Sequence, residues 1–155
     1  MIDELTGKGN FKEKVRAILK NGIGHGYPFV IHGALRDREK QRQLVDAGFS
    51  RTMRSKHLPG RDGKARAADI VHEGLYWQAG KEFWVMLGRL ALTQGCDWGG
   101  LWGLDRRTRA KFRKFLTDRA KPFVPEMWHG PLGWDCAHVQ SRTAIWSKIE
   151  QLWKG

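Results

Sequence analysis

Three side chains that suit a divalent metal ion stand in two well-separated parts of the chain. His57 and Asp69 lie in its first half, and His138 lies far downstream within residues 134–139. A catalytic zinc ion takes three protein ligands and keeps its fourth position open for water. Asp135 precedes His138 by three residues and remains as a carboxylate that can accept a proton from that water. The residue types therefore indicate a hydrolytic zinc site.

Taken singly, the members of this set have structural alternatives. A lone histidine in a loop is often a surface residue, and an aspartate at a strand end is often only a turn residue. His72 lies three residues after Asp69 and would point to the opposite face of a strand, which favours a surface or supporting role. We expect Cys136 to pack in the interior, because a thiolate ligand there would crowd Asp135 and His138.

Composition limits the class of protein. The 155 residues are 41% hydrophobic and include eight tryptophans, which indicates one packed catalytic domain over residues 1–155, without a separate wall-binding domain. We expect a monomer. No run of 18 apolar residues is present, and the N-terminus lacks the pattern of a secretory signal. We therefore expect synthesis in a cytoplasm and no transmembrane segment, with Cys96 and Cys136 as unpaired thiols.

The net charge of +12 and the pI near 10.2 indicate a polyanionic partner. Charge alone does not distinguish nucleic acid from an anionic cell envelope. We interpret one predicted helix, residues 105–119, as a landing surface for such a polymer, with a merely solubilising face as the alternative. Its basic residues are Arg106, Arg107, Arg109, Lys111, Arg113 and Lys114.

Periodicity and turn residues predict the elements that must position the site. Helices are expected at residues 11–20, 36–47, 75–94 and 105–119, and after Ser141 with Ala144, Ile145, Ile149 and Leu152 inward. Strands are expected at residues 27–31, 65–71 and 134–140, a long loop at 48–63, and irregular glycine-rich chain at 97–103. Asn21 and Gly22 should end the first helix, and Gly95 the third. This order favours an α+β fold, with helices packed around a small antiparallel sheet.

The order of the motifs resembles a known family of zinc peptidases, which contains the D-alanyl-D-alanine carboxypeptidases and the phage L-alanyl-D-glutamate endopeptidases. Its pattern reads Ser-x-His-x-x-Gly-x-Ala-x-Asp, then Trp-Gly-Gly, then Glu or Asp-x-x-His. The matching residues are Ser55, His57, Ala67, Asp69, Trp98, Gly99, Gly100, Asp135 and His138. Arg36, Gln41, Leu44 and Gly48 also fit the helix that precedes this pattern in the family. The resemblance runs from about residue 28 to 140.

Three details depart from the family pattern. His57 and Asp69 are separated by eleven residues where the pattern has six, so the turn at residues 59–63 must absorb an insert. Ala65 stands at the usual glycine. Residues 136–139 read Cys-Ala-His-Val in place of the commoner Trp-Pro-His-Phe, which keeps the ligand spacing.

The resemblance implies the zinc peptidase fold shared by Hedgehog proteins and D-Ala-D-Ala peptidases, with Zn²⁺ bound by His57, Asp69 and His138. Asp135 would be the general base, and Arg36 would contact the substrate carbonyl. Ser55 would support the site. Further candidates for substrate contact are Arg54, Trp98 and Trp102.

The implied function is that of a phage lysis enzyme, an L-alanyl-D-glutamate endopeptidase that cuts the peptidoglycan stem peptide in the periplasm after release from the host cytoplasm. A D,D- or L,D-carboxypeptidase or dipeptidase of the same family is the alternative within the enzyme class. A nucleic-acid-binding protein or metal nuclease is the alternative from another class. It would explain the charge but not the ordered motifs, so we expect no specific nucleic acid partner.

Overall fold

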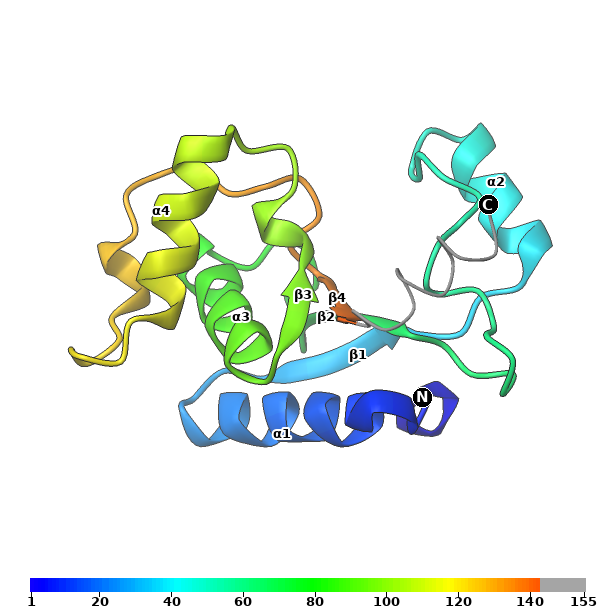
Figure 1. Cartoon of the computed structure of the whole chain (residues 1–155), viewed down its shortest axis with the longest axis horizontal. Coiled ribbons are helices and arrows are strands. Elements are labelled where there is room, and N and C mark those ends of the chain that lie inside the picture. Colours follow the sequence, from blue (N-terminus) through cyan, green and yellow to red (C-terminus); the bar gives the residue numbers. More distant parts are fainter. Residues whose placement is uncertain (143–155) are drawn as a thin grey trace, which may run out of the picture.

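The computed structural model describes residues 1–142, which form one antiparallel sheet with four α-helices and four short 3₁₀ helices (Figure 1). The α-helices are α1 (Phe11–Gly24), α2 (Arg38–Asp46), α3 (Lys81–Thr93) and α4 (Arg106–Thr117). The strands are β1 (Phe29–Gly33), β2 (Ala67–His72), β3 (Cys96–Trp98) and β4 (His138–Ser141). The 3₁₀ helices are η1 (Ile2–Glu4), η2 (Lys8–Asn10), η3 (Gly99–Leu101) and η4 (Pro125–Met127). The α+β prediction is confirmed.

The sheet has the strand order β1-β2-β4-β3, and every neighbouring pair is antiparallel. One face packs against α1 and α3, as the T-shaped contact between Phe29 of β1 and Phe83 of α3 shows, with ring centroids 4.8 Å apart. Because side chains alternate along a strand, residues of the opposite parity face away from this core. The paired residues Asp69 and His138 lie on that other face.

Helix α1 continues past its predicted end at residue 20, because Gly22 lies inside the helix and allows close packing instead of forming a turn. Gly22 is buried in the helix, and a Cβ there would collide with the ring of Phe29. The chain turns only at Gly26, whose φ is +84°. The prediction that Asn21 and Gly22 end the helix is therefore wrong.

Helix α3 begins at Lys81, six residues later than predicted. The preceding segment is a turn in which Gly74 and Tyr76 have positive φ values of +101° and +50°. Leu75, the first residue of the predicted helix, is 52% exposed as a result. The apolar side chains along α3 are buried, and Gly95, with φ +74°, follows the helix as its expected stop.

The segment at 97–103 is more regular than predicted, because Cys96–Trp98 pairs with β4 as an edge strand and Gly99–Leu101 forms η3. The strand predicted at residues 134–140 is shorter than expected, because β4 comprises only His138–Ser141. Ser141 lies in that strand opposite Cys96. The predicted final helix falls outside residues 1–142. None of the helices described is long and apolar enough to cross a bilayer.

The contact between α3 and the indole of Trp98 leads to a stability prediction. A Cβ on Gly88 would lie 2.5 Å from Cε3 of Trp98, which is only 1% exposed and has no room to move. We expect Gly88→Ala to lower the free energy of unfolding by about 1–3 kcal/mol in urea denaturation, as overpacking does. Gly24→Ala is the control, because nothing lies within 4 Å of its Cβ position. A Gly88→Ala protein as stable as the unsubstituted one would contradict this packing.

Candidate active site

The three predicted ligands converge on the open face of the sheet. Asp69 in β2 lies directly opposite His138 in β4, and the loop after α2 brings His57 to them. His57 Nε2 lies 3.3 Å from Asp69 Oδ1, and His138 Nδ1 lies 3.7 Å from the same oxygen. All three ligand atoms lie within 4.8 Å of one another. Two atoms bound tetrahedrally to one zinc ion are about 3.3 Å apart, so this group could hold a metal ion.

Hydrogen bonds on the far side of each imidazole indicate which nitrogen faces the cluster. His57 Nδ1 lies 2.7 Å from the backbone oxygen of Ala34, and His138 Nε2 lies 2.9 Å from Oε1 of Gln140. Both partners are acceptors, so we assign the ring protons to those nitrogens and the lone pairs to the cluster. Metal-binding histidines are typically oriented in this way by a carbonyl or carboxylate.

The donor set fits a metal ion for a further reason. His57 is only 2% exposed, and its Nε2 is buried without a hydrogen-bond partner among the described residues. A buried nitrogen without a partner destabilises the fold unless it binds something. A metal ion at the centre of the cluster would satisfy this atom.

Asp69 carries the negative charge of the cluster. Burial alone would raise the pKa of its carboxyl, but the imidazoles of His138 and His57 beside it lower the pKa below its usual value. Arg36 Nη2 lies 3.5 Å from Asp69 Oδ2. The carboxylate is therefore ionised near neutral pH and available as an oxygen ligand.

Asp135 lies beside the cluster, with Oδ2 3.9 Å from His138 Nδ1. Burial raises the pKa of its carboxyl. The backbone here is packed closely on Gly99, where a Cβ would collide with the carbonyl oxygen of Asp135. This contact gives the glycine of the Trp-Gly-Gly segment a positioning role. A carboxyl group with a raised pKa, next to a metal-binding cluster, is suited to proton transfer.

Arg36 is fixed by Gln41 of α2. Arg36 Nη1 donates a hydrogen bond to Oε1 of Gln41 at 2.7 Å, and its backbone N–H donates to the carbonyl of His57 at 2.8 Å. Gln41 is fully buried, and its Nε2 donates to the carbonyl of Thr52 at 2.6 Å. This amide therefore connects α2, the loop that carries His57, and the guanidinium beside Asp69.

This connection predicts a moderate loss of function in a Gln41→Leu variant. Leucine of similar size would remove the acceptor that holds the Arg36 guanidinium and the shorter of the two hydrogen bonds to the Thr52 carbonyl. We expect about a tenfold loss of kcat/KM and a loss of about 1–3 kcal/mol in the free energy of unfolding. Steady-state kinetics and urea denaturation measure the two effects. Gln43→Leu, on the exposed side of the same helix, is the control, and equal activity of both variants would contradict the anchoring role.

The remaining candidates lie at different distances from the cluster. Ser55 Oγ accepts a hydrogen bond from the backbone N–H of His57 at 3.2 Å, consistent with its expected support of the site. The ring of Trp102 lies beside His138, with centroids 4.8 Å apart. Arg54 is exposed, and among the described interactions only its backbone N–H is seen, donating to Thr52 Oγ1.

Trp98 lies in the core and does not form the wall of a groove. It is 1% exposed, and its ring packs edge-on against Phe112 at 5.6 Å. Its indole N–H donates a hydrogen bond to the carbonyl of Cys136 at 2.6 Å, which fixes the segment between Asp135 and His138 against the core. The expectation of direct substrate contact by Trp98 is therefore corrected to a structural role.

The residues that we expected outside the cluster do lie outside it. His72 packs against Phe83 of α3, with ring centroids 5.2 Å apart, on the core side of the sheet. Cys96 and Cys136 are free thiols, as expected. Burial raises their pKa values to about 11 and about 12, so both are protonated near neutral pH.

Gln140 is a site residue that the motifs did not indicate. It stands two positions after His138 in β4, so both side chains share one face of the strand. Strand alternation around a predicted ligand is the signal that would have identified it.

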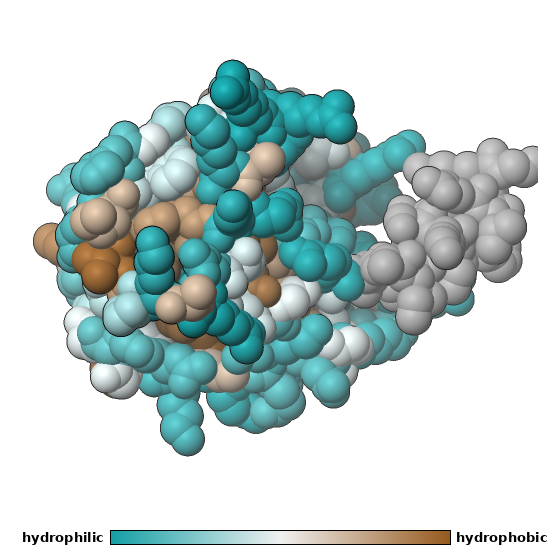
Figure 2. Space-filling view, turned by 60° about the vertical axis from the view of Figure 1, so that its left-hand side comes forward, coloured by the Kyte–Doolittle hydropathy of each residue, from teal (hydrophilic) through white to brown (hydrophobic). Residues whose placement is uncertain are grey.

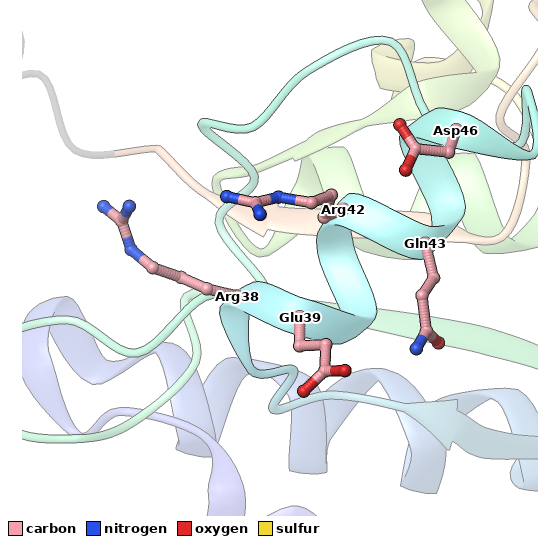
Figure 3. Close-up of a pocket in the computed structure, with 5 residues that line it drawn as sticks. All are labelled: Arg38, Glu39, Arg42, Gln43 and Asp46. Atoms are coloured by element: carbon pink, nitrogen blue, oxygen red, sulfur yellow. The ribbon is translucent and has the colours of Figure 1, made fainter.

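A surface hollow lies along α2. Figure 3 shows Arg38 and Arg42 extending to one side of the helix. Its other lining residues are Glu39, Gln43 and Asp46. None of these residues belongs to the metal-binding group, so the hollow is not part of the candidate catalytic site.

Two known proteins resemble the chain, although no family model matches it. A stretch of 94 residues, 59% of the chain, is 33% identical to the L-alanyl-D-glutamate peptidase of Listeria phage A118. The matched part spans 34% of that protein's length. The crystal structure of the Serratia marcescens L-Ala D-Glu endopeptidase ChiX is similar over 94% of this chain and 86% of that one, with a TM-score of 0.56 and 20% identity. At this identity, the second likeness supports the fold alone.

Proposed function

We propose that this protein belongs to the zinc peptidase family described above and is an L-alanyl-D-glutamate endopeptidase that cuts the stem peptide of peptidoglycan during phage-induced lysis. The observation that carries the proposal is the convergence of His57 Nε2, Asp69 Oδ1 and His138 Nδ1 beside the carboxyl group of Asp135. The name of the similar phage protein contains this bond, which supports the choice of substrate.

The residues around the cluster have separable roles in this reaction. Zinc held by His57, Asp69 and His138 would supply an activated water molecule and polarise the scissile carbonyl. Asp135 takes a proton from the attacking water and delivers it to the leaving amine. Arg36, held by Gln41, stabilises the negative charge that develops on the carbonyl oxygen.

Digestion of isolated peptidoglycan tests the proposal. Zinc-loaded protein should release stem peptides that begin with D-glutamate and leave L-alanine on the glycan, as read by mass spectrometry. Release of terminal D-alanine alone would instead identify a carboxypeptidase. A DNA mobility shift that survives EDTA, with no cleavage of peptidoglycan, would favour a nucleic-acid-binding protein.

The basic surface of α4 supports a second part of the proposal, which is adsorption to an anionic envelope. All six basic residues of the predicted landing surface are exposed, while Phe112 and Leu116 of the same helix are buried. Figure 2 shows this side of the molecule, where hydrophilic side chains project over more hydrophobic ones. Such a surface would concentrate the enzyme near its substrate without taking part in the chemistry.

Charge reversal on α4 separates adsorption from catalysis. We expect the triple variant Arg106→Glu, Arg109→Glu and Arg113→Glu to lyse cells stripped of their outer membrane about tenfold more slowly at low salt. The difference should disappear at high salt, because exposed charges are then screened. Cleavage of soluble muropeptides should be unchanged. Equal lysis rates at low salt would contradict the landing role.

A further inference from the structure

Two aromatic side chains project from the turn between β2 and α3. Tyr76 is 51% exposed and Trp77 is 53% exposed. His32 of β1 packs edge-on against both, with ring centroids 5.9 Å from Tyr76 and 4.5 Å from Trp77. These three residues are called the aromatic platform below.

The turn holds these rings in place at an energetic cost. Tyr76 has a φ of +50°, which a bulky residue rarely adopts. Its backbone N–H donates to the carbonyl of His72 at 2.8 Å, and the N–H of Leu75 donates to Nδ1 of the same histidine at 3.3 Å. A constrained backbone that keeps large rings in water is typical of a binding surface.

The platform lies next to the metal-binding cluster on the sheet. His32 precedes Gly33, which pairs with Asp69, and a Cβ on Gly33 would lie in van der Waals contact with Asp69 Oδ2, at 3.7 Å. Val30, two residues before His32, pairs with Val71, two residues after Asp69. The register shifts between Ile31 and Gly33, so His32 is the extra residue at this irregularity, one position from the partner of Asp69.

The chemistry of the platform suits a sugar ring. A pyranose presents an apolar face of C–H bonds and a polar rim of hydroxyl and amide groups. Tyrosine, tryptophan and histidine offer the complementary surface, an apolar ring with a polar edge. Peptidoglycan places such a sugar close to the bond that we propose is cut, because its L-alanine is attached to a muramyl sugar through a lactyl group.

The distances agree with this assignment. Asp69 and His72, where the turn begins, are three residues apart in β2, or about 10 Å at roughly 3.3 Å per residue. The muramyl ring begins about two extended residue lengths, roughly 7 Å, from the carbonyl carbon of L-alanine. A ring that begins at that distance would extend to the platform while the scissile carbonyl lies at the cluster.

We infer that the aromatic platform of His32, Tyr76 and Trp77 binds the muramyl sugar that carries the stem peptide, so that the enzyme prefers glycan-linked substrate to free peptide. This inference rests on the proposed function and adds a sugar subsite to it.

Kinetics on two matched substrates test the inference. One substrate is a stem peptide linked to its disaccharide, and the other is the same peptide without sugar. The zinc-loaded wild-type protein should cleave the linked substrate with a lower KM. We expect Trp77→Ala to raise KM for the linked substrate roughly fivefold to tenfold, with kcat unchanged. The kinetic constants for the free peptide should stay the same. Trp77→Phe should retain most of the preference.

Controls distinguish a failure of the sugar subsite from a failure of the proposed function. Met127→Ala removes another exposed apolar side chain (61% exposed) and should change KM for neither substrate. Equal effects of Trp77→Ala on both substrates, or no effect on either, would overturn the subsite. If wild-type protein cleaves neither substrate, the proposed function is wrong.

A binding assay on glycan strands tests the sugar subsite independently of cleavage. Wild-type protein should be retained on peptide-free glycan strands at about 0.3 M salt, which screens non-specific attraction, and Trp77→Ala should not be retained. Equal retention of the two proteins would overturn the subsite, as would no retention of either.

Discussion

Replacement of Asp135 by asparagine is expected to lower kcat by a factor of about 10³ while the protein keeps its metal ion. The Asp135 carboxyl lies beside the cluster, 3.9 Å from His138 Nδ1, and is not a member of the ligand group. Asparagine keeps the size of the side chain but has no basic oxygen, so only the proton transfer is lost. Contributions of general bases are typically 10²–10⁴-fold.

Single-turnover assays on a soluble muropeptide, together with metal analysis of the same sample, measure this effect. Asp46→Asn, an exposed position at the end of α2, is the matched control and should behave as wild type. Loss of metal from Asp135→Asn would show that this carboxylate is a ligand. Retention of full activity would show that it is not the base.

Replacement of His138 by alanine is expected to remove both metal and activity. His138 supplies one of the three ligand atoms, and its loss would leave only His57 and Asp69. We expect metal affinity to fall by at least about 10²-fold, because loss of a direct ligand should exceed the 10–100-fold effect of losing a supporting partner. Activity at stoichiometric zinc should fall below detection.

His72→Ala is the matched control for this prediction, because His72 stands in the same sheet but packs against Phe83 on the core side. Titration of metal-free protein with zinc compares the affinities directly. A His138→Ala protein that binds zinc as tightly as His72→Ala would remove His138 from the ligand set.

The convergence of His57, Asp69 and His138 could be predicted from the sequence, because the order of their motifs matches that of a known family of zinc peptidases. Neither Asp69 nor His138 indicates a partner by itself, yet both motifs end at strands that pair directly in the sheet. Alternation along β2 also placed His72 correctly on the opposite face. The insert between His57 and Asp69 does not displace His57, whose ring still reaches the Asp69 carboxylate.

Other features depend on contacts between distant residues, which local patterns do not encode. Gly22 looked like a helix stop, but it is the position where α1 approaches Phe29. Trp98 stands between residues typical of a binding loop, yet Gly88 of α3 makes room for its ring in the core. The late start of α3 follows from the left-handed conformation of Tyr76, which sequence periodicity does not reveal.

The central claim is that His57, Asp69 and His138 hold one catalytic metal ion, and zinc reconstitution of EDTA-treated protein tests it most directly. Metal content and endopeptidase activity should both fall to background after chelation. They should return together, with activity reaching its plateau at one zinc ion per chain. Undiminished cleavage of the stem peptide by chelated protein with no bound metal would contradict the claim.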